Sequence, residues 1–127
     1  MGQKARIVVV DDEQTICEFS QAILERTGKF DVRTFTDSEK GWESIKSEPP
    51  DLLLLDVDMP GLDGGDLAKR LESLPTTRAV SVVFLTALIR KEEEAEQERI
   101  QRHYFLAKPI SANELIERIE IILGDRV

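Results

Sequence analysis

The fold of this chain is indicated by residues 51–64, which read Asp-Leu-Leu-Leu-Leu-Asp-Val-Asp-Met-Pro-Gly-Leu-Asp-Gly. The four leucines at positions 52–55 form a continuous apolar run without polar alternation. Such a run is typical of a strand buried on both faces, as in a parallel sheet covered by helices. The turn dipeptides Pro60-Gly61 and Asp63-Gly64 follow soon after, so we expect the strand to end near Asp56.

Four similar segments recur along the chain. Residues 7–10, 80–85 and 104–107 are short and almost entirely apolar, which also suits buried strands. Residues 30–35 alternate between apolar and polar side chains, which is typical of an edge strand. The sequence therefore predicts five strands.

The stretches between these strands have helical spacing. We expect the following apolar residues to pack on the sheet: Ile16, Phe19 and Ile23; Trp42 and Ile45; Leu67, Leu71 and Leu74; Leu115, Ile119 and Ile122. Gly28 follows the first helix as a stop signal, and Ser111 to Glu114 form a capping box before the last. Strands alternating with helices predict a doubly wound α/β fold with right-handed crossovers.

Composition excludes several classes of protein. The 127 residues correspond to one domain, 1–127, and carry a net charge of −8. This charge argues against direct binding of nucleic acid or of an anionic membrane surface. A single cysteine cannot form an internal disulfide, and one cysteine with one histidine cannot build a structural zinc site, so Cys17 is interpreted as a packing residue. Without a predicted membrane span or signal peptide, we expect a cytoplasmic location.

Acidic, hydroxyl and amino side chains follow the predicted strands. They are Asp11 and Asp12 after the first strand, Asp56 and Asp58 after the third, Thr86 after the fourth and Lys108 after the fifth. Because the carboxyl ends of parallel strands meet at one edge of a sheet, these residues should converge there. Clustered carboxylates favour a hard cation such as Mg²⁺, and a carboxylate can attack phosphorus to form an aspartyl phosphate. A hydroxyl and an ammonium group could bind the remaining phosphoryl oxygens.

These motifs, in this order, resemble the receiver domain of bacterial two-component response regulators. The matching segments are Val10 to Glu13, the leucine-rich strand with Asp56 and Met59 to Gly64, Thr86-Ala87, and Lys108-Pro109. The resemblance covers essentially the whole chain. It implies a CheY-like, flavodoxin-like (βα)5 fold with a parallel sheet in the order 2-1-3-4-5.

The resemblance also implies a role for each matching residue. Asp56 would accept the phosphoryl group, Asp12 and Asp56 would bind Mg²⁺, Asp11 would lie nearby or act through water, and the Asp58 backbone carbonyl would complete the metal ligands. Thr86 would be the switch hydroxyl, Lys108 the phosphate-binding lysine and Phe105 the switch aromatic. The peptide bond before Pro109 would be cis.

The implied function is a phosphorylation-operated switch that promotes its own modification and is not a turnover enzyme. A sensor histidine kinase or a phosphotransfer protein would be the donor. Output would run through contacts with an unidentified protein or through a fused output domain. A dimer could form through the face made by the fourth helix, the fifth strand and the fifth helix.

Two departures and two alternatives accompany this hypothesis. Asp58 and Leu88 occupy the two positions that flank the path of the attacking water in the family, one acidic and the other apolar. Residues 90–102, where the fourth helix is expected, contain only Ala95 and Ile100 as apolar residues. The first alternative is a haloacid-dehalogenase-type phosphatase, since Asp56-Val57-Asp58 matches its Asp-x-Asp motif. The second is a degenerate receiver that signals without phosphate, which the presence of Asp56, Thr86 and Lys108 disfavours.

Overall fold

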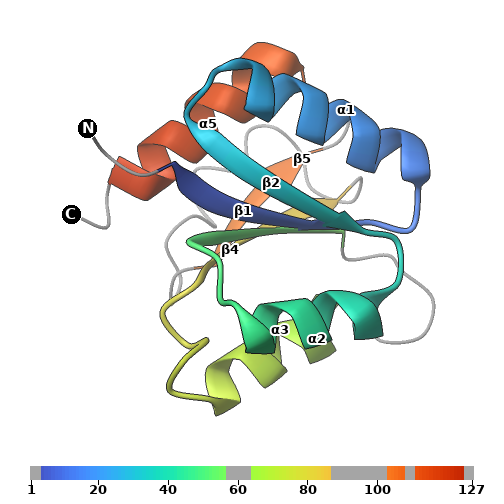
Figure 1. The fold of residues 1–127 in the computed structure, drawn as a ribbon, viewed down its shortest axis with the longest axis vertical. Coiled ribbons are helices and arrows are strands. Elements are labelled where there is room, and N and C mark those ends of the chain that lie inside the picture. The colour runs from blue at the N-terminus through green and yellow to red at the C-terminus, as the bar shows by residue number, and fades with distance from the viewer. Residues whose placement is uncertain (1–3, 57–63, 87–102, 108–110, 125–127) are drawn as a thin grey trace.

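A computed structural model describes residues 4–56, 64–86, 103–107 and 111–124, which form nine elements (Figure 1). In chain order these are β1 (Ala5–Val10), α1 (Gln14–Arg26), β2 (Phe30–Phe35), α2 (Ser38–Ser47), β3 (Leu52–Asp56), α3 (Gly64–Ser73), β4 (Ser81–Thr86), β5 (His103–Ala107) and α5 (Ala112–Gly124). All five predicted strands are present, each within a residue or two of its expected position.

The strands form one parallel sheet in the order β2-β1-β3-β4-β5. Helices α1 and α5 cover one face of this sheet and α2 and α3 cover the other, as Figure 1 shows. This arrangement confirms the doubly wound α/β architecture and the predicted strand order. It also confirms that residues 30–35 form an edge strand.

The leucine run of β3 is buried on both faces, as its composition predicts. Leu52 and Leu54 belong to the core cluster beneath α1 and α5, whereas Leu53 and Leu55 belong to the cluster beneath α2 and α3. All four are at most 1% exposed. The central strand therefore contributes apolar surface to two cores at once, which anchors the end of β3 rigidly.

The orientation of α1 differs from the sequence-based expectation. Cys17, Ser20 and Leu24 are its buried residues, while Phe19 is 42% exposed and Ile16 and Ile23 are only half-buried. Helix α1 is thus rotated about its own axis, relative to the orientation that its apolar residues alone predict. In the other helices the expected residues do face the core, whereas Leu74 lies directly after the end of α3 and is only partly buried.

Hydrogen bonds to β2 explain the rotation of α1. The Gln21 side-chain amide donates to the carbonyl oxygen of Val32 at 3.1 Å, and the Val32 N–H donates to the Glu25 carboxylate at 3.3 Å. These backbone groups would otherwise be exposed at the edge of the sheet, where unpaired strand groups invite pairing with another chain. The rotation that brings Gln21 and Glu25 to this edge turns Phe19 toward solvent.

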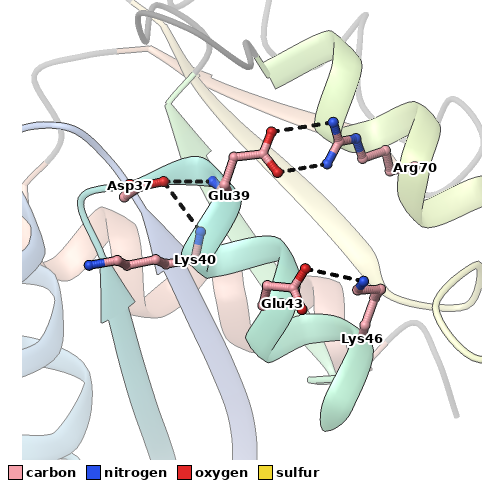
Figure 2. Close-up of polar contacts among 6 residues, drawn as sticks. All are labelled: Asp37, Glu39, Lys40, Glu43, Lys46 and Arg70. Atoms are coloured by element: carbon pink, nitrogen blue, oxygen red, sulfur yellow. Dashed lines mark hydrogen bonds and ion pairs between the residues drawn. The ribbon is translucent and has the colours of Figure 1, made fainter.

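Helix α2 is fixed at its N-terminus and against α3 (Figure 2). The Asp37 carboxylate accepts hydrogen bonds from the backbone N–H groups of Glu39 and Lys40, which is the preferred form of an N-cap. The guanidinium of Arg70 on α3 forms a two-point ion pair with the Glu39 carboxylate, at 3.0 and 3.3 Å. Lys46 pairs with Glu43 one turn along the same helix, at 3.2 Å.

The backbone of α2 lies very close to the end of β1. A Cβ atom added at Gly41 would be 2.8 Å from Cγ2 of Val10 and 3.6 Å from Cβ of Phe35. Val10 is fully buried and directly precedes Asp11. Glycine at position 41 therefore permits a helix–sheet approach that any larger residue would obstruct.

Candidate functional site: an acidic cluster at the carboxyl edge of the sheet

The strand register brings Asp11 and Asp56 together. Val10, the last residue of β1, is opposite Leu55 in β3, so the next residue of each strand lies at the same level of the sheet. Asp11 is fully buried and Asp56 is 3% exposed, whereas Asp12 is exposed. The site therefore consists of two buried carboxylates with a third at the surface.

Asp11 is fixed through three of its own atoms. Its backbone N–H donates to the carbonyl oxygen of Phe35 at 3.1 Å, which extends the β1–β2 pairing by one residue. Its Oδ1 accepts a hydrogen bond from the N–H of Glu13 at 2.9 Å, and its carbonyl oxygen accepts one from the Cys17 thiol at 3.4 Å. These contacts come from β2, from the turn before α1 and from α1 itself.

The three carboxylates can hold a metal ion. One oxygen from each of Asp11, Asp12 and Asp56 lies within 4.8 Å of the others. Oxygens bound to one Mg²⁺ at ~2.1 Å are separated by about 3 to 4.2 Å, so small side-chain rotations would bring this set into the required range. Oxygen-only donors suit a hard divalent cation, and neutralising three adjacent negative charges would remove their mutual repulsion. The residues fit such an ion.

The electrostatic influence of the cluster reaches Cys17. Burial raises the pKa of the Cys17 thiol above its ordinary value of 9.0, and the negative charge of Asp11 raises it further. The thiol therefore remains protonated at neutral pH. A protonated thiol can donate a hydrogen bond and adds no charge to an already acidic site.

Other predicted site residues lie on the neighbouring strands. Thr86 is the last residue of β4 and pairs with Ala107, the last residue of β5. Phe105 is half-buried in β5, and its ring stacks on Phe84 of β4 with a centroid separation of 5.1 Å and an interplanar angle of 25°. Tyr104, the residue before Phe105, is buried in the cluster on the opposite face of the sheet.

The remaining predicted residues lie outside the described part of the chain. These are Asp58, Leu88, Lys108, Pro109 and the predicted helix at 90–102.

In the part of the chain that the structure describes, no helix combines the length and the apolar composition needed to cross a bilayer.

Two residues with a bearing on the site are not identified as such by the sequence. Cys17 is interpreted there as packing, and its hydrogen bond to Asp11 depends on the rotation of α1. Gly41 carries no local signal, because glycine within a helix gives no indication of which strand lies against it. Both contacts arise between segments that are separate in the sequence.

Comparison with known proteins identifies relatives over nearly the whole chain. The family model described as "Response regulator receiver domain" matches residues 7–120. The alkaline phosphatase synthesis transcriptional regulatory protein PhoP of Bacillus subtilis is 36% identical over 121 residues, which is 93% of this chain and 48% of that protein. The chain thus spans about half the length of this curated relative. It spans 25% of the length of the response regulator PleD of Caulobacter vibrioides.

Solved structures show the same fold. The receiver domain of the Francisella response regulator 1452 is 28% identical, with a TM-score of 0.81 over 98% of this chain and 100% of that one. The chemotaxis protein CheY4 of Vibrio cholerae superposes with a TM-score of 0.82 over 94% of this chain and 99% of that one. Its 21% identity supports similarity of fold alone.

Proposed function

Because this chain belongs to the response regulator receiver family of two-component signalling, we propose that Asp56 is the residue on which it is phosphorylated. Receiver domains are phosphorylation switches and not turnover enzymes, so the haloacid-dehalogenase-type alternative has no support in the family match. The observation that carries the proposal is the position of Asp56 at the end of the central strand, beside Asp11 and Asp12. The donor would be a sensor histidine kinase or a phosphotransfer protein.

The transfer would join an Asp56 carboxylate oxygen to the phosphorus of a phosphohistidine. The phosphorus–nitrogen bond would break, and its electron pair would return to the imidazole ring of the donor. Such a transfer needs in-line positioning and neutralisation of charge more than it needs covalent chemistry from the protein. Burial of Asp56 at 3% exposure, at the end of a strand buried on both faces, supports the positioning part of this requirement.

Mg²⁺ is the cofactor we propose for this site. Asp11, Asp12 and Asp56 would hold it, and the backbone carbonyl of Asp58, outside the described residues, would complete the protein ligands. When bound, the ion would neutralise charge on the phosphoryl oxygens. We propose that Thr86 and Lys108 bind the other phosphoryl oxygens, because Thr86 is the last residue of β4 and Lys108 comes directly after the last residue of β5 in the sequence.

The proposed signal passes from the site to the edge of the sheet. Phe105 is half-buried and stacked on Phe84, two residues before Thr86 on β4. A new hydrogen bond from Thr86 to the phosphoryl group would change the packing next to this pair and draw Phe105 inward. The surface of β5 and α5, together with residues 90–102, is the proposed output or dimerisation face. The output partner would be a separate protein or a fused domain.

Phosphorylation by a small donor tests the proposal. Incubation with acetyl phosphate and MgCl2 should add one phosphoryl group to the intact protein, measured by mass spectrometry. Asp56→Asn should abolish this addition, because the amide is a poor nucleophile at the same position. The matched control is Asp51→Asn, which changes the aspartate that precedes the same strand, where its carboxylate accepts a hydrogen bond from the N–H of Arg6 at 2.8 Å.

The control should be labelled like the wild type. Undiminished labelling of Asp56→Asn, or equal loss in Asp51→Asn, would contradict the assignment of Asp56. Continuous release of phosphate from many monoesters would instead favour a phosphatase.

A further inference from the structure

The inference concerns Cys17, whose side chain connects α1 to the acidic cluster. The residue is 1% exposed, and its Sγ donates a hydrogen bond to the carbonyl oxygen of Asp11 at 3.4 Å. The carbonyl oxygen of Phe35 at the end of β2 is a second acceptor, at 3.8 Å. One thiol therefore contacts the ends of two adjacent strands at the edge of the sheet where the carboxylates converge.

The acceptor atom gives this contact its significance. The carbonyl oxygen of Asp11 belongs to the peptide group that joins Asp11 to Asp12. Since a peptide group is planar, fixing its oxygen also restricts the direction in which the chain enters Asp12. Asp12 is exposed, so packing against the core does little to hold its carboxylate near those of Asp11 and Asp56.

The backbone N–H and the Oδ1 atom of Asp11 restrain different groups. The N–H bond to Phe35 fixes the preceding peptide group, and the bond from the Glu13 N–H fixes the side chain at Oδ1. The thiol restrains the Asp11 carbonyl from the side of α1.

We propose that Cys17 is a positioning residue for the metal site: its hydrogen bond to the Asp11 carbonyl orients the Asp11–Asp12 peptide so that the three carboxylates can bind one divalent cation. The inference rests on the proposed function, because it requires that the cluster binds Mg²⁺. Cys17 touches neither the ion nor the phosphoryl group in this role. Its effect is on affinity, through the conformation of the segment that carries two of the ligands.

Calorimetric titration of the full chain with MgCl2 tests the proposal. Cys17→Ala and Cys17→Val remove the donor, with a smaller and a larger apolar side chain respectively, whereas Cys17→Ser keeps a donor. Loss of one net hydrogen bond predicts that Mg²⁺ binds about threefold or more weakly to the Ala and Val variants. The Ser variant should remain within about twofold of the wild type, since its hydroxyl can donate to the same oxygen.

Ser20→Ala is the matched control. Ser20 is also buried on α1, at 2% exposure and one turn beyond Cys17, and no described hydrogen bond joins it to Asp11. This variant should melt at a different temperature from the wild type and bind Mg²⁺ with unchanged affinity. The contrast separates positioning of the site from general stabilisation of the helix, because a purely structural role would make affinity follow the melting temperature in all four variants.

The possible results are distinct. Wild-type affinity in Cys17→Ala or Cys17→Val, whichever is folded, would overturn the positioning role and leave the metal site intact. Equal weakening in Cys17→Ser and Cys17→Ala would also overturn it, since volume and not the donor would then matter. If the wild type itself does not bind Mg²⁺, the proposed metal site fails, and the role of Cys17 fails with it.

Discussion

Substitution of Gly41 by alanine should destabilise the protein although alanine is the better helix former. Gly41 lies within α2, so alanine alone would add about 1 kcal/mol of helix stability. The added Cβ, however, would be 2.8 Å from Cγ2 of Val10, where ordinary carbon–carbon contacts are ~3.5–4.0 Å. About 1 Å of overlap must therefore be relieved by moving either Val10 or α2.

Neither movement is easy. Val10 is fully buried and β-branched at the end of β1, between β2 and β3, and α2 is held by its Asp37 cap and by the ion pair between Glu39 and Arg70. Overpacking of this kind costs about 1–3 kcal/mol, and this site should lie toward the upper end. After the gain in helix propensity, we expect a net loss of about 1–2 kcal/mol in the free energy of unfolding.

Urea denaturation followed by circular dichroism at 222 nm measures this change. Fluorescence of Trp42 is unsuitable, because the tryptophan is adjacent to the substituted residue. The denaturation midpoint should fall while the m-value stays constant. Gly124→Ala is the control, since a Cβ at this helical position meets nothing within 4 Å and should not destabilise.

A double-mutant cycle identifies the clash as the cause. Val10→Ala removes the methyl group that the new Cβ would meet, so it should be less destabilising in the Gly41→Ala background than in the wild type. If Gly41→Ala is as stable as the wild type, or if the two substitutions are additive, the close approach of α2 to β1 is not what requires glycine.

Three further predictions concern the site and its surroundings. Mg²⁺ at tenfold its dissociation constant should stabilise the wild type by about 1.4 kcal/mol in urea melts, and Asp12→Ala should lose most of this gain; equal shifts in both would exclude a metal ligand at Asp12. Phe105→Leu should lower the free energy of unfolding by about 1 kcal/mol, because it removes the ring that stacks on Phe84. Phe105→Tyr keeps this ring and should retain the wild-type stability. The Cys17 thiolate absorbance at 240 nm, taken as the difference from Cys17→Ala, should titrate with a midpoint above 9.0 in the folded protein. Because the thiol ionises at a lower pH in the unfolded chain, the free energy of unfolding should fall as pH rises from the pKa of the unfolded thiol toward that of the folded one. A titration midpoint below 9.0 would contradict the conclusion that burial raises the pKa of Cys17.

The strands and their edge of convergence could be predicted from the sequence. A run such as Leu52 to Leu55 has no face that tolerates water, so it must lie in the centre of a covered sheet, as both core clusters confirm. Once the strands are parallel, the residues that follow them share one edge. Asp11, Asp12 and Asp56 could therefore be grouped by their positions after the predicted strands, and the structure confirms that their oxygens meet.

The rotation of α1 could not be predicted in the same way. Its apolar residues Ile16, Phe19 and Ile23 suggest one buried face, yet Phe19 is exposed. Burial of apolar area competes here with the hydrogen-bonding needs of the edge strand, which Gln21 and Glu25 satisfy at Val32. Hydrophobic periodicity contains no information about which backbone groups of a distant strand lack partners.

What the sequence by itself determined is the layered α/β fold and the set of acidic residues at its carboxyl edge, because local patterns of hydrophobicity specify which segments must be buried on both faces. The tertiary structure decided how those residues are supported. The contact of Cys17 with the Asp11 carbonyl and the approach of Gly41 to Val10 each join segments that are separate in the chain. Such contacts depend on how each helix is positioned and rotated against the sheet, which no local segment of the sequence specifies.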